Sequence, residues 1–228
     1  MTESFISIPL SCTKEALDSI LNKENYSPEK LVSFFEKDFA EEYSSDVGVW
    51  EGYSLKEHTL MVLNQFEKYF ADKPLPGGVD HNFFRVILTL HDIRKLRAIE
   101  EGERSKEHEY TFEIVEKVLT QLEYKNSDVL LAKSLMTGYP LGKFVLTGDL
   151  EKAVVNIKQA AEKANMDLAD FFDLQIIYYQ VDASSYTEDA GGIRSLDYLF
   201  RFEPENRKIS FVPELEQAMA ILKKNLLS

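Results

Sequence analysis

The chain has 228 residues, of which 44% are apolar, and a formal net charge of -13. Its length and apolar content suit one folded domain and exclude a disordered chain, while the negative charge argues against duplex nucleic acid as a partner. The sequence has no apolar run of the roughly 18 residues that a membrane helix needs, no signal-like N-terminus and one cysteine, Cys12, so we expect a cytoplasmic protein without membrane contact.

Helices are predicted near the N-terminus. Residues 14–21 carry an apolar stripe at helical spacing. Ser27 and Pro28 form a helix start, with the serine as N-cap and the proline at the first helical position. We expect these helices, within residues 13–45, to pack across a core at about residues 50–190.

A helix with an inward-facing histidine is predicted next. Residues 55–69 follow helical spacing after Ser54 as N-cap, and this spacing puts His58 on the apolar face. Trp50 is interpreted as a packing anchor, because large aromatic side chains near helix starts usually pack. The Pro- and Gly-rich stretch 72–80 then predicts a loop.

The most apolar segment is the run 83–95, which ends in an adjacent histidine and aspartate, His91 and Asp92. Its apolar residues cover nearly every side of a helix, so we expect a buried helix with this pair at its C-terminal end. A lone buried carboxylate costs several kcal/mol unless it is paired, hydrogen-bonded or bound to a metal. The pair is therefore expected to have polar partners from other helices.

A charged stretch, residues 94–106, follows the pair. Its interleaved glutamates favour a solvated loop for most of its basic residues, and Lys95 is the exception for which we expect a role. The next helix, residues 106–122, places His108 on its apolar face.

Two further helices, residues 127–136 and 150–164, are predicted on either side of a turn at residues 137–143. Asp149 is expected to cap the second of them. The Gly-Lys pair inside the turn lacks the spacing of a phosphate loop and follows no strand, so we assign it no nucleotide-binding role.

A long apolar helix over residues 171–186 turns Asp182 inward, with Ser185 on the same face. Residues 188–192 then predict a mobile loop beside Asp182, where a lid or a substrate-entry segment is expected.

The C-terminal residues 198–226 predict a small β-hairpin followed by a helix that Pro213 begins. All other predicted elements are helical. We therefore expect a mostly all-α protein in which residues 1–228 form a single domain, with the N-terminal helices and the C-terminal hairpin and helix as appendages.

Four helices each turn ionisable groups inward, and these groups are His58, the His91-Asp92 pair, His108 and Asp182. If these groups were scattered through the core, each would be buried without a partner, and this would lower the stability of the fold. Imidazole and carboxylate are ordinary ligands of first-row metals. Convergence on one divalent cation is therefore predicted.

The order His58, His91-Asp92, Asp182, with the doublet ending a buried helix and followed by Lys95, resembles the HD superfamily of metal-dependent phosphohydrolases. The resemblance covers well over half of the chain. It implies an all-helical HD-like bundle in which the two histidines and the two aspartates hold the metal.

The resemblance also implies roles for the surrounding residues. Asp92 is expected to orient or deprotonate the attacking water as well as to bind metal. Lys95 is expected to contact the scissile phosphate, with His108 as a pocket residue. Weaker candidates for substrate binding are Arg94, Lys106 and Ser185. Many members of the family have glycine where this chain has Arg94.

The implied function is hydrolysis of a phosphomonoester or phosphodiester of a nucleotide or other small molecule by a metal-activated water. One divalent ion is expected, because the chain has no histidine after His108, and manganese, iron, cobalt, nickel, zinc and magnesium are the candidates. Two other interpretations stay open. Arg94 in place of glycine motivates the idea of a degenerate HD module that binds or regulates, against which the intact ligand set argues. Some relatives of the fold are di-iron oxygenases, and the single His108 makes that interpretation the weaker one.

Overall fold

The computed structural model describes residues 10–46, 52–103 and 106–228. These residues form helices and one antiparallel ribbon of two strands, so the predicted mostly all-α fold with a small C-terminal β-hairpin is confirmed. Trp50 lies outside the described residues. Within the described ranges, no helix combines the length and the apolar character needed to cross a membrane.

The helices follow one another along the chain. The first half contains α1 (Lys14–Leu21), α2 (Pro28–Glu36), α3 (Ala40–Ser44), α4 (Leu55–Tyr69), α5 (His81–Leu90), α6 (Lys95–Glu100) and α7 (Glu107–Gln121). The second half contains α8 (Asn126–Met136), α9 (Pro140–Thr147), α10 (Leu150–Ala164), α11 (Leu168–Ser184) and α12 (Pro213–Leu226). Strand β1 (Phe200–Glu203) pairs antiparallel with β2 (Lys208–Phe211), with Phe200 opposite Phe211.

Side-chain caps define the starts of the helices that carry the candidate site. At α4, the Ser54 hydroxyl accepts from the Glu57 amide while the Glu57 carboxylate accepts from the Ser54 amide, so the predicted N-cap is part of a capping box. Asp80 caps α5 by accepting from the amide of Phe83, and Asp167 caps α11. Each such cap stabilises its helix by about 1 kcal/mol.

Helix α5 lies in the middle of the core, and seven of its ten residues are buried. It contacts α2, α4 and α7. The helix ends at Leu90 with His91 as its C-cap, so the His91-Asp92 pair lies at its C-terminal end, as predicted. The side chain of His91 supports this end, because its Nδ1 bonds the carbonyl oxygen of Leu88 at 2.7 Å. In a continuing helix that carbonyl would accept from the amide of Asp92.

The charged stretch after Asp92 was predicted to be a solvated loop, and part of it is helical instead. Its residues Lys95–Glu100 form α6, and Ala98 of this helix is fully buried. The segment consists largely of good helix formers, so local propensity prevails there over the charge pattern.

The predicted turn between α8 and α9 is also shorter than expected, because α9 already begins at Pro140. Proline is favoured at the first helical position, where its missing amide costs no hydrogen bond. Gly138 and Tyr139 have φ angles of 80° and 45°, and this left-handed conformation reverses the chain before α9. A tyrosine rarely adopts it, which indicates that its surroundings fix it.

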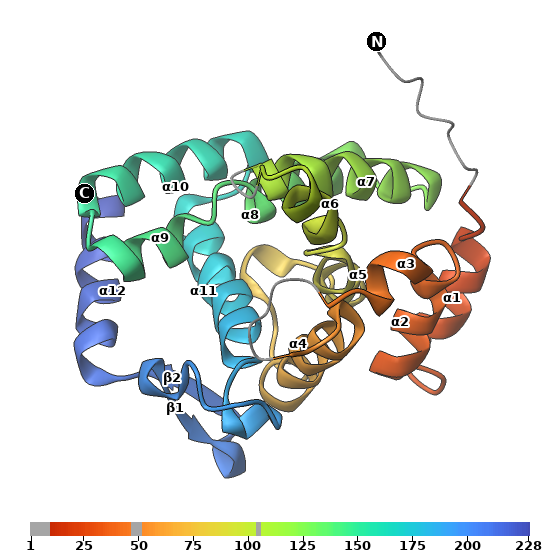
Figure 1. Ribbon diagram of the computed structural model, residues 1–228. Helices are drawn as coiled ribbons and strands as arrows, with labels where there is room; N and C mark the ends of the chain where they lie inside the picture. Colours follow the sequence, from red (N-terminus) through yellow and green to blue (C-terminus); the bar gives the residue numbers. More distant parts are fainter. Residues whose placement is uncertain (1–9, 47–51, 104–105) are drawn as a thin grey trace.

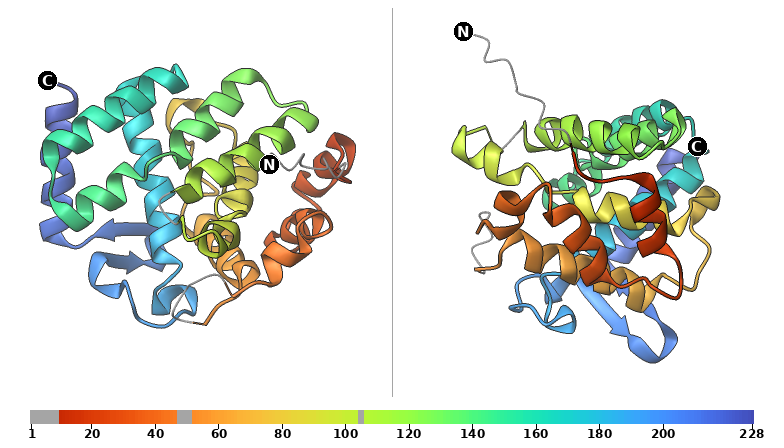
Figure 2. Two further views of the ribbon diagram at one scale, coloured as in Figure 1. Left: turned by 45° about the horizontal axis from the view of Figure 1, so that its top comes forward. Right: turned by 90° about the vertical axis from the view of Figure 1, so that its right-hand side faces the viewer.

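Helix α11 is the axis around which the other helices are arranged (Figure 1). It contacts α4 on one side and α9, α10 and α12 on the other, while α2 packs outside α4 and α5. The β-ribbon lies beside the C-terminal half of α11 (Figure 2), where Tyr179 contacts the rings of Phe200 and Phe211. One cluster of buried apolar residues extends from Cys12 to Leu226. The N-terminal and C-terminal appendages therefore share a hydrophobic core with the central helices.

The segment predicted to be a mobile loop, residues 188–192, is hydrogen-bonded to α4. Its residues Glu188–Ala190 form a short 3-10 helix. The carboxylate of Asp189 accepts hydrogen bonds from Gln65, Lys68 and Tyr69 of α4. These bonds argue against a lid that opens freely at this position.

Replacing Asp189 by alanine is expected to lower the free energy of unfolding by roughly 1–3 kcal/mol, because Gln65 and Tyr69 lose a charged acceptor in a largely buried setting. Urea denaturation measures the difference. Glu188→Ala is the matched control, since Glu188 pairs with Arg194 at a surface where the two side chains are 62% and 73% exposed. That change should stay within about 0.5 kcal/mol. Equal stability of the two variants would contradict the anchoring role of Asp189.

Candidate metal centre

Three parts of the fold bring four ligand-type side chains together. His58 comes from the start of α4, His91 and Asp92 come from the turn after α5, and Asp182 comes from the last turn of α11. The two histidines are 1% and 5% exposed, and each aspartate side chain is 15% exposed. The predicted convergence of these four groups is therefore seen in the structure, with the carboxylates at its more accessible side.

Short distances separate the donor atoms of this cluster. The Nε2 atoms of His58 and His91 are 3.2 Å apart, and Oδ1 of Asp182 lies 3.5 Å from each of them. Asp92 places Oδ2 3.7 Å from the His58 Nε2 and Oδ1 3.8 Å from the His91 Nε2. Metal bonds of about 2.0–2.2 Å put neighbouring donors roughly 3.0–3.5 Å apart. His58, His91 and Asp92, whose ligand atoms all lie within 4.8 Å of one another, therefore form a group that could hold a metal, and Asp182 lies beside both of its imidazoles.

Hydrogen bonds on the far side of each ring direct both Nε2 lone pairs into the cluster. Nδ1 of His91 donates to the carbonyl of Leu88. Nδ1 of His58 lies 3.3 Å from Oγ of Ser185, and that hydroxyl donates to the carbonyl of Asp182 at 2.6 Å, so the imidazole is the donor. Such partners are usual for metal-binding histidines. The two facing lone pairs repel each other unless a proton or a cation lies between them.

Burial and the two carboxylates have opposite effects on the histidines. Burial lowers the pKa of His58. Burial also opposes the protonation of His91, but the carboxylates of Asp92 and Asp182 outweigh it and raise the pKa of His91 to about 9. Burial alone would raise the pKa of both aspartates, yet Lys95 and the histidines lower that of Asp92, and the two imidazoles lower that of Asp182. Without an ion, the cluster therefore contains an imidazolium and two carboxylates.

A lysine and a glutamate border the cluster near Asp92. Nζ of Lys95 lies 2.7 Å from Oδ2 of Asp92. Although burial opposes its charge, the Asp92 carboxylate raises the pKa of Lys95 above its usual range. Glu107 begins α7, and burial together with the nearby Asp92 charge raises its pKa to about 7. Sequence reasoning missed Glu107, because helical spacing drew attention to the next residue, His108.

Two tyrosines and His108 also border the cluster. The ring of His108 stacks on that of Tyr139 with centroids 6.5 Å apart, and burial lowers the pKa of His108. The Tyr139 hydroxyl donates to Oδ2 of Asp182 at 3.3 Å. Tyr186 stacks on His58 with centroids 4.8 Å apart and places its hydroxyl 3.4 Å from Nε2 of that histidine. His108 thus lies beside the cluster without being one of its four ligands.

Tyr139 is a residue of the site that the sequence analysis missed. It lies between Gly138 and Pro140, in the left-handed conformation that ends the turn before α9. A Cβ atom on Gly142 would fall 1.7 Å from the Tyr139 ring, so only glycine leaves room for it. A tyrosine between glycine and proline, with a second glycine three residues later, was the available signal for a constrained side chain.

Two of the residues predicted to bind substrate form ion pairs with glutamates in the structure, and their contact with substrate stays a prediction. Arg94 donates from Nη1 to Glu42 at 2.7 Å, so its guanidinium joins the start of α6 to α3. Lys106 pairs with Glu103 at 2.7 Å, and its side chain is 48% exposed. Both cations are therefore engaged by glutamates and not directed at the four ligands.

Ser185, the third residue predicted to bind substrate, is fully buried. Its hydroxyl lies between the Asp182 carbonyl and Nδ1 of His58. These contacts indicate a role in orienting His58, while the predicted contact with substrate stays a prediction.

Ser185→Ala is expected to weaken the binding of a divalent ion by about 10–100-fold, the usual cost of removing a partner that orients a metal-binding histidine. Titration against a chelator of known affinity measures it. Ser184→Ala is the matched control, because the hydroxyl of the adjacent Ser184 is buried without a hydrogen-bond partner in the described structure. If both variants bound the ion as tightly as the parent, Ser185 would not orient His58.

Comparison with models of protein families, with curated proteins and with solved structures gave no match to this chain. Membership of the HD superfamily therefore stays a prediction from the order of His58, His91-Asp92 and Asp182. Function has to be argued from the metal centre and its surroundings.

Proposed function

We propose that this protein is a metal-dependent phosphohydrolase of the HD type that cleaves a phosphomonoester or phosphodiester of a small molecule. The supporting observation is the buried group of His58, His91 and Asp92, whose ligand atoms lie within 4.8 Å of one another, with Asp182 beside both imidazoles. Two imidazoles and two carboxylates suit manganese, iron, cobalt, nickel or zinc better than magnesium. A divalent ion bound there would polarise a phosphoryl oxygen and lower the pKa of a water.

The charges around the cluster favour a phosphorylated substrate. In the metal-free protein the His91 imidazolium and the Lys95 ammonium offset the Asp92 and Asp182 carboxylates. Exchange of the one proton on His91 for a divalent ion leaves a net positive charge. This local field attracts a phosphate ester into a protein whose net charge of -13 would otherwise repel it.

Asp92 and Lys95 are the proposed catalytic side chains. Asp92 presents one oxygen toward each histidine and is placed to orient or deprotonate an attacking water. Lys95 reaches the same carboxylate at 2.7 Å, where its ammonium would stabilise charge that develops on the phosphoryl group. Tyr186 would donate its hydroxyl to a phosphoryl oxygen, because that hydroxyl already points at the imidazole of His58.

Assays with simple phosphomonoesters and phosphodiesters in the presence of each divalent ion test the proposal. Lys95→Met is expected to lower kcat by about 100-fold or more with unchanged metal content, because it removes a charge that acts on the transition state. Lys56→Met is the matched control, since Lys56 pairs with Glu36 away from the cluster. Lack of turnover with every metal and ester, or an unchanged kcat for Lys95→Met, would refute the proposal.

The alternative function is that of a binding or regulatory module. This alternative is based on Arg94, which stands where many family members have glycine. The Arg94 side chain pairs with Glu42, and the four proposed ligands are still present. Tight binding of phosphate esters by the metal-loaded protein without turnover would favour the module. Iron-dependent oxygen uptake would favour the di-iron oxygenase instead.

A further inference from the structure

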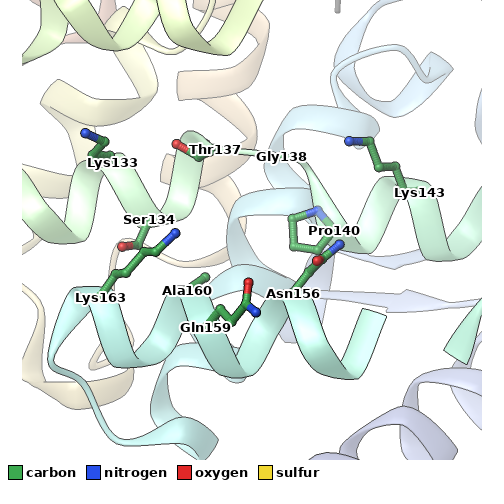
Figure 3. A pocket seen from close by; sticks show the side chains of 10 residues that line it. All are labelled: Lys133, Ser134, Thr137, Gly138, Pro140, Lys143, Asn156, Gln159, Ala160 and Lys163. Carbon is green, nitrogen blue, oxygen red and sulfur yellow. The ribbon is translucent and has the colours of Figure 1, made fainter. Parts of the chain in front are cut away.

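A second site is suggested by a cavity that lies apart from the four metal ligands. It opens to solvent and is lined by the end of α8, the turn before α9, the start of α9 and one face of α10, with a volume of about 200 Å³. Figure 3 shows Asn156, Gln159 and Lys163 extending from α10 toward this turn, with Lys133 and Lys143 on the other side.

The cavity is cationic in a strongly acidic protein. Lys133, Lys143 and Lys163 line it, and no carboxylate does in the described structure. Within the part of the chain that the structure describes, none of these three ammonium groups forms an ion pair with a carboxylate. Lys133 lies over the ring of Phe112 at 4.7 Å, a contact that leaves its hydrogen-bond donors available. Three unpaired cations in a chain of net charge -13 indicate a place where an anion binds.

The polar groups of the cavity suit a phosphate group. Lysine binds phosphate as a point charge, and the amides of Asn156 and Gln159 and the hydroxyl of the buried Ser134 add neutral hydrogen-bonding groups to the lining. The volume is below the roughly 300–1,000 Å³ of typical pockets for drug-sized ligands. It therefore suits a compact anion.

The turn before α9 separates this cavity from the metal centre. Gly138 and Pro140 line the cavity, while Tyr139 between them turns its side chain to Asp182 and His108. The two sites are therefore neighbours with different walls. The sequence gives no sign that Lys143 binds an anion, because its Gly-Lys pair lacks the spacing of a phosphate loop. The fold brings Lys143 to the same cavity as two other lysines, one from α8 and one from α10.

We propose that the lysine-lined cavity is a binding site for a small phosphorylated molecule, distinct from the metal centre. The site does not depend on the proposed hydrolase activity, since it shares no side chain with the four ligands or with Lys95. Its ligand is recognised by phosphate charge and by hydrogen bonds.

Calorimetric titration of the metal-free full-length protein with inorganic phosphate and with pyrophosphate, at about 150 mM salt to screen long-range attraction, tests the proposal. Saturable binding is expected in the parent. The double variant Lys143→Gln and Lys163→Gln should bind roughly 10–100-fold more weakly, because two charged donors are lost. The matched control is Lys152→Gln with Lys158→Gln, which removes the same charge from α10 outside the cavity lining. It should bind as the parent does.

The Lys95→Met variant tests whether phosphate binds in the cavity or at the metal centre. It should bind phosphate as tightly as the parent. Lack of saturable binding in the parent would overturn the proposal, and so would equal losses in the cavity variant and its control. Loss of binding in Lys95→Met alone would also overturn it, because the anion would then occupy the metal centre.

Discussion

The Asp92→Ala protein is expected to hold almost no divalent metal and to lose at least about 1,000-fold in phosphoester hydrolysis, while it unfolds as cooperatively as the parent. The substitution removes a ligand whose oxygens lie 3.7 and 3.8 Å from the two imidazole nitrogens, and with it the group proposed to activate water. It also frees Lys95 from its partner. The expected cost in stability is about 1–3 kcal/mol, below the roughly 5–15 kcal/mol by which a domain of this kind is stable.

Elemental analysis after exposure to divalent ions and gel filtration measures the metal content of the variant and the parent. Asp173→Ala is the matched control, because Asp173 lies on α11 with Asp182 but pairs with Lys223 at the surface. Near-stoichiometric metal in the parent and the control, with little in Asp92→Ala, is the expected result. Absence of metal from all three folded proteins would mean that the four groups only satisfy one another, and the regulatory interpretation would replace the hydrolase.

The ligand set could be predicted from the sequence because each ligand interrupts a strong local pattern. His58 and Asp182 occupy apolar faces of helices with clear periodicity, and the His91-Asp92 pair ends the most apolar run of the chain. Buried polar groups need partners, and the only partners of the right chemistry were one another. Periodicity and the cost of burial therefore predicted that these groups converge, and the resemblance to the HD superfamily distinguished the four proposed ligands from His108.

The surroundings of the ligands could not be predicted, because they depend on contacts between distant segments. Arg94 contacts Glu42 of α3, which lies 52 residues away in the sequence. Tyr139 reaches Asp182 across 43 residues and only because Gly142 leaves room for its ring. The end of α5 at the His91-Asp92 pair could be predicted, but the bond from the His91 ring to the carbonyl of Leu88 could not.

The opposite pKa shifts of the two histidines lead to a strong pH dependence of metal binding. His58 is neutral at pH 7 because burial lowers its pKa, while His91 keeps its proton up to about pH 9 under the influence of Asp92 and Asp182. An ion must therefore displace one proton, and that proton comes from His91. The apparent affinity should rise about tenfold per pH unit, or roughly 100-fold from pH 6 to pH 8, and level off above pH 9.

Competition with a chelator at several pH values measures this slope, and calorimetry in buffers of different ionisation enthalpy counts the protons released. One proton per ion is expected at pH 7, where a pair of ordinary exposed histidines would release about half a proton in total and two raised histidines would release two. The metal-free protein should show the opposite trend in stability. A histidine with a raised pKa in the folded state stabilises the fold below its unfolded pKa near 6.5, and this contribution is lost as the pH rises through about 9. A pH-independent affinity between pH 6 and pH 8 would show that His91 is not the imidazolium of the metal-free cluster.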